Sequence, residues 1–155
     1  MEKSVIKILL VEDNPIDQTA FIRLVNKENL PYDYIVVDSL SAAKEAIHFH
    51  EFDIIVADYN LSDGTGLELL SDVGDKPLIL VTGAGSEEVA INALRGGVTD
   101  YLVKDISGSY SAMLSISIEN ALALKRAQSE LKKYQEQFEN LIQELREDFA
   151  EEKCM

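Results

Sequence analysis

Five polar side chains directly follow runs of apolar residues that are typical of buried strands. Glu12 and Asp13 come after the first run, Asp58 ends the third, Thr82 follows the fourth and Lys104 follows the fifth. Because the carboxyl ends of parallel strands meet at one edge of a sheet, we expect these side chains to converge there. Any one of them alone is more simply read as a solvated residue where a strand becomes a loop. All five in this order favour a shared site.

The chemistry of this set points to phosphoryl transfer. Three carboxylates in one cleft, from Glu12, Asp13 and Asp58, need neutralising partners. Lys104 supplies one positive charge, and a hard divalent cation such as Mg²⁺, which prefers oxygen ligands, can supply the rest. No His or Cys follows a predicted strand, which argues against zinc or copper. An aspartate beside Mg²⁺ and a lysine can attack a phosphoryl group to give an aspartyl-phosphate, and a threonine hydroxyl can bond a phosphoryl oxygen.

The elements that must position these groups alternate between strand and helix patterns. Strands are predicted at residues 5–11, 34–37, 52–57, 78–81 and 98–103. Helices are predicted from Pro15 to about Asn29, at 42–50 with Ser41 as its cap, at 67–73, from Ser86 to Arg95, and from 109 to the end. Five such units in series predict an α/β fold with a doubly wound parallel sheet and helices on both faces.

Composition limits the classes of partner. The chain has 155 residues, and its 28 acidic and 14 basic side chains give a net charge of −14. Such a charge repels nucleic acid and anionic membranes but suits divalent cations, so neither nucleic acid nor membrane is an expected partner. The apolar runs are only as long as strands, the N-terminus lacks a signal-peptide pattern, and the single Cys154 excludes an intrachain disulfide. We therefore expect a cytoplasmic protein.

The strand-end motifs resemble those of the receiver domains of bacterial two-component response regulators. The matching segments are ILLVEDN at 8–14, DIIVADYNLSDGTGLELL at 53–70, LILVTGAGS at 78–86 and DYLVK at 100–104, within a similarity that covers about residues 5–122. The resemblance implies a five-stranded parallel sheet of order 2-1-3-4-5. It also implies a phosphohistidine on a sensor histidine kinase or phosphotransfer protein, or a small acyl phosphate, as the phosphodonor. Such a domain catalyses its own phosphorylation and slow dephosphorylation, and is a signalling domain rather than an enzyme.

The same resemblance implies a role for each site residue. Asp58 is the implied phosphoacceptor, and Thr82 and Lys104 are the implied contacts of the phosphoryl group. Tyr101 is the implied aromatic switch residue, acting together with Thr82. The implied Mg²⁺ ligands are the carboxylates of Glu12, Asp13 and Asp58 and the backbone carbonyl of Asn60.

The sequence departs from the pattern of that family at two positions. Ser62 stands four residues after Asp58, where proline is usual, while Gly66 is present as expected. Asp105 replaces the proline that commonly follows the lysine. A cis bond is inexpensive only before proline, so the Lys104–Asp105 bond is expected to be either trans or a strained cis.

The last third of the chain carries a second pattern. Its apolar residues recur at alternating spacings of three and four, the repeat of a coiled coil: Leu124, Ala127, Leu131, Tyr134, Phe138, Leu141 and Leu145. We expect residues 1–122 to form the receiver and 123–155 a helical coiled-coil extension or linker, with a parallel homodimer formed through this helix. A helix folded back on the receiver, or disorder, is the alternative, and Asp148 at the next seam position weakens the pattern.

Two other functions fit parts of the sequence. A receiver-like domain can bind partners or dimerise without being phosphorylated, although the complete set of five site residues argues against that reading. An aspartate-based phosphatase usually has a second aspartate two residues after its nucleophile. Here that position is Asn60, which cannot serve as a general acid.

Overall fold

The computed structural model describes residues 5–83, 87–104 and 109–153. The chain divides into two compact units, 1–122 and 123–155. Helix α4 (Ser109–Lys153) belongs to both, its first turns to the first unit and the remainder to the second.

A five-stranded parallel sheet forms the centre of the first unit, with strand order β2-β1-β3-β6-β7. A separate two-stranded hairpin, β4-β5, follows β3. The predicted doubly wound α/β fold and its order 2-1-3-4-5 are therefore confirmed. The strands are β1 (Ile6–Val11), β2 (Tyr32–Val37), β3 (Ile54–Asp58), β4 (Asn60–Leu61), β5 (Gly64–Thr65), β6 (Leu78–Thr82) and β7 (Asp100–Val103).

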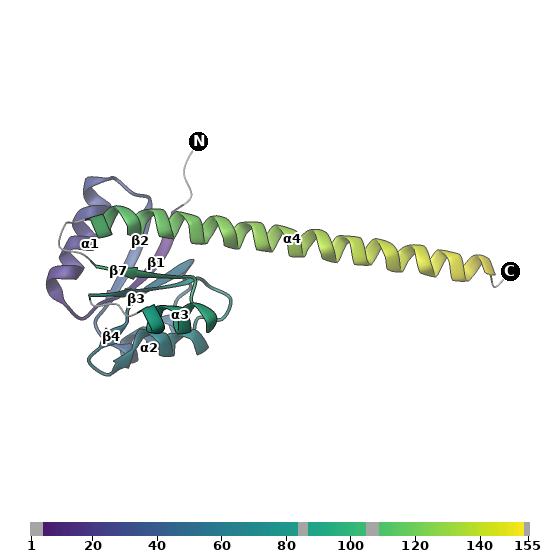
Figure 1. Ribbon diagram of the computed structural model, residues 1–155. Helices are drawn as coiled ribbons and strands as arrows, with labels where there is room; N and C mark the ends of the chain where they lie inside the picture. Colours follow the sequence, from purple (N-terminus) through teal and green to yellow (C-terminus); the bar gives the residue numbers. More distant parts are fainter. Residues whose placement is uncertain (1–4, 84–86, 105–108, 154–155) are drawn as a thin grey trace. The chain divides into compact units, whose positions relative to one another are not determined.

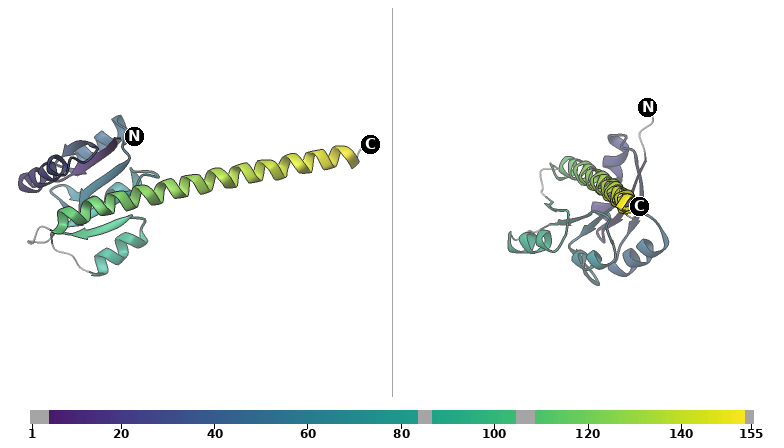
Figure 2. Two further views of the ribbon diagram at one scale, coloured as in Figure 1. Left: turned by 90° about the horizontal axis from the view of Figure 1, so that it is seen from above. Right: turned by 90° about the vertical axis from the view of Figure 1, so that its right-hand side faces the viewer.

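Helices cover both faces of this sheet (Figures 1 and 2). Side chains alternate along each strand, so neighbours in sequence enter opposite layers. Ile8 and Leu10 pack with α1 and the first turns of α4, whereas Leu9 and Val11 pack on the other face with α2 and α3. The helical elements are α1 (Pro15–Lys27), α2 (Leu40–Phe49), the 3₁₀ helix η1 (Gly66–Ser71), α3 (Glu87–Arg95) and α4.

Helix α1 begins where the sequence predicts it, with Pro15 at its first position. The side-chain oxygen of Asn14 accepts a hydrogen bond from the backbone N–H of Ile16 at 2.9 Å, and this caps the helix. The side-chain amide of Gln18 donates to the backbone carbonyl of Glu12 at 2.6 Å. The start of α1 is therefore tied to the carboxyl end of β1.

Helix α2 begins earlier than the sequence predicts. Its cap is Ser39 rather than Ser41, and the Ser39 hydroxyl accepts from the N–H of Ala42 at 3.0 Å. The carboxylate of Asp63 accepts from the N–H groups of Leu40 at 2.8 Å and Ser41 at 2.9 Å. Ser41 thus lies inside the first turn. The short helix predicted at 67–73 is a 3₁₀ helix over Gly66–Ser71, and the predicted cap Ser86 lies outside the described residues.

The second unit is the helical segment after residue 122, and it exposes its apolar residues. Within the described ranges, no helix is both long enough and apolar enough to cross a membrane. The large apolar side chains that are exposed here are Leu124, Leu131, Tyr134, Phe138, Leu141, Leu145 and Phe149.

Candidate functional site

Three carboxylates gather at the carboxyl edge of the sheet. Oxygen atoms of Glu12, Asp13 and Asp58 all lie within 4.8 Å of one another. The register explains this, because Val11 of β1 lies beside Ala57 of β3, so the residues that follow them are neighbours as well. Glu12 is buried, Asp13 is exposed and Asp58 is partly buried.

The ammonium of Lys104 lies among these carboxylates. Its Nζ forms an ion pair with Glu12, and it lies 2.8 Å from Oδ2 of Asp17 and 3.4 Å from Oδ2 of Asp58. The backbone N–H of Lys104 donates to the carbonyl of Thr82 at 2.7 Å, which extends the β6-β7 pairing to this residue. The structure therefore brings Glu12, Asp58 and Lys104 into one constellation.

Apolar side chains line one side of this group of charges, and their burial alters the pKa values of the ionisable groups. The small pocket around the charges is lined by the buried residues Leu10, Phe21, Val56 and Val81. Burial, together with the neighbouring carboxyl group of Asp58, raises the pKa of Glu12 to about 8, although Lys104 opposes the shift.

The same surroundings act on the other charged groups. Burial alone would lower the pKa of Lys104, but its hydrogen bonds to Asp17 and Glu12 outweigh that cost and raise it above its ordinary value. Burial likewise opposes ionisation of Asp17, yet the bond from Lys104 holds its pKa below the ordinary value. Tyr110 also lines the pocket, and burial raises the pKa of its phenol.

The donor set fits a hard divalent cation. Oε2 of Glu12 is buried without a hydrogen-bond partner among the described residues, although a buried carboxylate oxygen normally has one. It belongs to a cluster whose ligand atoms are all carboxylate oxygens, the type that Mg²⁺ prefers. Asn60 lies at the start of β4, and its N–H donates to Oδ1 of Asp58 at 3.2 Å. The role of its carbonyl as a ligand stays a prediction.

Thr82 and Tyr101 belong to β6 and β7, the two strands that follow β3 in the order of the sheet. Thr82 ends β6, is fully buried, and follows Val81, the residue paired with Asp58. Tyr101 packs against the core cluster on the α2 and α3 face, and its ring meets that of Tyr59 edge-on, with centroids 6.5 Å apart. Tyr59, the residue after Asp58, therefore contacts Tyr101, while the roles of Thr82 and Tyr101 as a switch pair stay predictions.

Sequence reasoning missed Asp17. This residue is in the first turn of α1, and Phe21 and Val25, four and eight residues later, are buried against the sheet. The helical period therefore places Asp17 on the same face of α1 as Phe21 and Val25, at the end of the helix nearest the strand ends. This apolar face was visible in the sequence and could have pointed to Asp17. Asp105 lies outside the described residues, so the trans or cis geometry of the Lys104–Asp105 bond stays a prediction.

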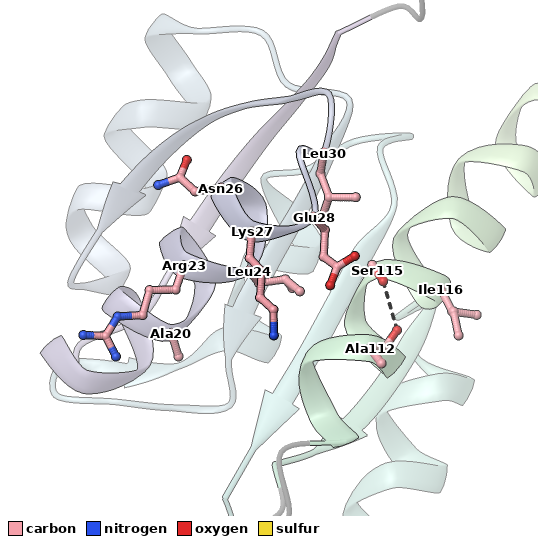
Figure 3. Close-up of a pocket in the computed structure, with 10 residues that line it drawn as sticks. All are labelled: Ala20, Arg23, Leu24, Asn26, Lys27, Glu28, Leu30, Ala112, Ser115 and Ile116. Carbon is pink, nitrogen blue, oxygen red and sulfur yellow. Dashed lines mark hydrogen bonds between the residues drawn. The ribbon is translucent and has the colours of Figure 1, made fainter.

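A larger groove runs between α1 and the first turns of α4, away from the acidic cluster (Figure 3). Its walls combine apolar side chains such as Leu24 and Ile116 with the basic residues Arg23 and Lys27. It shares no lining residue with the small pocket around Lys104. The candidate chemistry therefore belongs to the strand ends and not to this groove.

Comparisons with known proteins agree with this geometry. Residues 8–110 match the family described as Response regulator receiver domain. The chain is 35% identical over 109 residues to the methanogenesis regulatory protein FilR1 of Methanothrix harundinacea, covering 63% of this chain and 24% of that protein. It is 29% identical over 120 residues to the response regulator protein FleR of Pseudomonas aeruginosa, covering 75% of this chain and 24% of that protein. The chain thus spans about a quarter of each of these relatives.

Solved structures show the same fold. The response regulator receiver domain protein from Methanospirillum hungatei JF-1 superposes with a TM-score of 0.70 at 22% identity, covering 81% of this chain and 99% of that one. The receiver domain of the sensor histidine kinase PA1611 from Pseudomonas aeruginosa PAO1, whose structure has a magnesium ion in its active-site cleft, gives 0.65 at 25% identity, covering 77% and 99%. With the family match over residues 8–110 and the acidic cluster at the strand ends, this chain belongs to the response regulator receiver domain family.

Proposed function

We propose that this chain is a phosphorylation-controlled signalling receiver. Asp58 accepts a phosphoryl group from the phosphohistidine of a sensor histidine kinase or phosphotransfer protein, in a Mg²⁺-dependent reaction. The observation that carries this proposal is the constellation around Asp58, in which two further carboxylates and the Lys104 ammonium converge on one strand end. The alternative, a receiver-like interaction module, does not need these charges together.

The transfer is a displacement at phosphorus. A carboxylate oxygen of Asp58 forms the new P–O bond while the P–N bond of the phosphohistidine breaks, and the electron pair of that bond remains on the imidazole nitrogen. The Lys104 ammonium neutralises charge on the phosphoryl oxygens, and the Thr82 hydroxyl donates a hydrogen bond to one of them. The chain thereby assists its own modification and is not a turnover enzyme.

Mg²⁺ is the proposed cofactor. Glu12, Asp13, Asp58 and the backbone carbonyl of Asn60 are its proposed ligands, and the unpartnered buried oxygen of Glu12 supports this set. When bound, the ion supplies positive charge against the carboxylates and the incoming phosphoryl group. Without it, Lys104 is the one cation among the described residues that pairs with these carboxylates.

The second unit is the proposed dimerisation element. We infer that residues 123–155 pair with the same segment of a second chain, because their apolar seam is exposed along its length. An isolated amphipathic helix leaves such a stripe in water, whereas a two-stranded coiled coil buries it. Phosphorylation of the receiver then alters the geometry of this helix pair, which is the proposed output of the chain.

The metal requirement gives the first test. The full chain is incubated with acetyl phosphate and Mg²⁺, or with acetyl phosphate and a chelator, and its intact mass is measured. We expect one added phosphoryl group with Mg²⁺ and none with the chelator. The pair Glu12→Gln and Asp13→Asn, made together, is expected to abolish the adduct in the presence of Mg²⁺. Equal adducts with and without the metal would contradict the proposed role of the ion.

A further inference from the structure

The Lys104 ammonium is closer to Asp17 than to the proposed phosphoacceptor. Nζ lies 2.8 Å from Oδ2 of Asp17 and 3.4 Å from Oδ2 of Asp58, and it also pairs with Glu12. An ammonium group has three N–H donors, and these three carboxylates match that number. A phosphoryl oxygen that binds Lys104 must therefore displace or share one of these contacts.

Asp17 is held in place by the start of α1. The helix is capped by Asn14, and Gln18 donates to the carbonyl of Glu12 at 2.6 Å, which joins the helix to β1. One turn later, Phe21 is buried in the core. The backbone of Asp17 is therefore anchored, so a movement of the ammonium toward Asp58 lengthens its contact with Asp17.

Among the three partners of Lys104, Asp17 is the one that can give way. Glu12 is buried in the acidic cluster, with 4% of its side chain exposed, and Asp58 is the proposed acceptor. The Asp17 side chain is 34% exposed, so water can solvate its carboxylate after the ammonium leaves.

We propose that Asp17 is a positioning residue that draws the Lys104 ammonium toward α1 and competes with a phosphoryl group for it. The proposal rests on the function proposed above. Asp17 thereby weakens the hold of the site on a phosphoryl group, because part of each new contact with Lys104 is offset by the lost contact with Asp17. Removing the charge of Asp17 releases Lys104 to the acceptor.

The test is the affinity of the full chain for beryllofluoride, a mimic of the phosphoryl group, titrated by NMR at saturating Mg²⁺. Asp17→Asn is expected to bind about fivefold more tightly than wild type, as follows from the loss of one partly exposed ion pair. Asp17→Glu, which keeps the carboxylate, should restore weaker binding. Asp38→Asn is the matched control, because Asp38 follows β2 at the same sheet edge and forms no ion pair with Lys104 among the described residues. Equal affinities of Asp17→Asn and Asp38→Asn would overturn the proposal.

A double-mutant cycle with Lys104→Met shows whether Asp17 acts through Lys104. In that background Asp17→Asn should change the affinity no more than Asp38→Asn does. An unchanged fivefold gain would mean that Asp17 acts by general repulsion, and would also overturn the proposal. If wild type bound beryllofluoride and formed an adduct with acetyl phosphate while Asp17→Asn had no effect, only this inference would fall. If wild type did neither, the proposed function would fall with it.

Discussion

A Cβ atom on Gly66 would overlap the backbone carbonyl oxygen of Asp58. It would also lie 3.0 Å from a methyl carbon of Leu80 and 3.2 Å from Cβ of Ala57. The backbone N–H of Gly66 donates to the carbonyl of Tyr59 at 2.9 Å. The start of η1, directly after the β4-β5 hairpin, therefore packs against the strand end that carries Asp58, and a side chain at this point requires the backbone to move.

Gly66→Ala is accordingly expected to move the backbone of Asp58. The added methyl group meets backbone rather than the end of a flexible side chain, so we expect a loss of about 1–3 kcal/mol in unfolding free energy and weaker Mg²⁺ binding. Gly83→Ala is the matched control, because nothing lies within 4 Å of a Cβ at Gly83. Urea unfolding and calorimetric Mg²⁺ titration measure both effects. Equal stability and metal affinity in the two variants would contradict the close approach.

Asp63 should make the stability of the first unit depend on pH. Its carboxylate accepts hydrogen bonds from the N–H groups of Ser41 and Leu40, and these bonds hold its pKa below the ordinary value of 3.8. A group with a lowered pKa in the folded state stabilises the fold above its unfolded value, and that contribution is lost as the pH falls through the folded value.

Asp63→Ala is therefore expected to lower the unfolding temperature at neutral pH, with a difference from wild type that shrinks below about pH 4. Asp63→Asn, which keeps an oxygen acceptor without the charge, should lose less stability at neutral pH. Thermal unfolding followed by circular dichroism across this pH range measures the difference. A gap between Asp63→Ala and wild type that stayed constant with pH would show that the carboxylate charge plays no part.

Thr82 and Tyr101 should respond to phosphorylation together. The proposed phosphoryl group draws the Thr82 hydroxyl toward Asp58 and vacates space on the face where Tyr101 lies. In wild type, beryllofluoride with Mg²⁺ should shift the NMR signals of the Tyr101 ring. Thr82→Ala should still bind the mimic but leave these signals nearly unchanged, because the hydroxyl that links the mimic to Tyr101 is missing. Equal shifts in both proteins would refute the coupling.

Charges placed in the seam should separate the proposed dimer. Leu131 and Leu141 are seam positions, and Leu131→Asp with Leu141→Asp would bury unpaired carboxylates if the helices pair. We expect the dissociation constant of the full chain to rise roughly a hundredfold or more, measured by analytical ultracentrifugation. The control is Ser129→Asp with Gln143→Asp, which adds the same charges on the outer face of the same helix. Equal masses for both variants at every concentration would remove the coiled-coil proposal.

Strand ends were predictable because burial on both faces leaves a continuous apolar run, and the polar residue that ends each run is unmistakable. Even so, β2 begins at Tyr32, two residues before its predicted start, because pairing with β1 buries Tyr32 while the polar Asp33 faces outward. An apolar run shows only the buried part of an edge strand. Because buried and exposed side chains alternate along a strand, a polar residue such as Asp33 can lie inside β2, and the strand begins before the apolar run does.

Contacts between distant segments could not be predicted. Ser39 and Ser41 lie two positions apart, and because both are serines their intrinsic preference for the N-cap position is the same. The choice depends on Asp63, 22 residues beyond Ser41, whose carboxylate occupies the N–H groups of the first turn. Likewise, Asp17 reaches Lys104 across 87 residues of sequence, and only the seating of α1 on the sheet brings the two together.

The most direct measurement of the central claim is the site of the phosphoryl adduct. The 155-residue wild type, Asp58→Asn and Asp53→Asn are incubated with acetyl phosphate and Mg²⁺, and their intact masses are compared. Asp53 precedes the first residue of β3, whereas Asp58 is its last residue, so the two aspartates lie at opposite ends of the strand. The carboxylate of Asp53 accepts a hydrogen bond from the N–H of Lys7. Asp53→Asn therefore controls for nonspecific acylation or phosphorylation. We predict one phosphoryl group on wild type and on Asp53→Asn, and none on Asp58→Asn. An adduct of equal yield on Asp58→Asn, or none on wild type, would contradict the assignment of Asp58 as the phosphoacceptor.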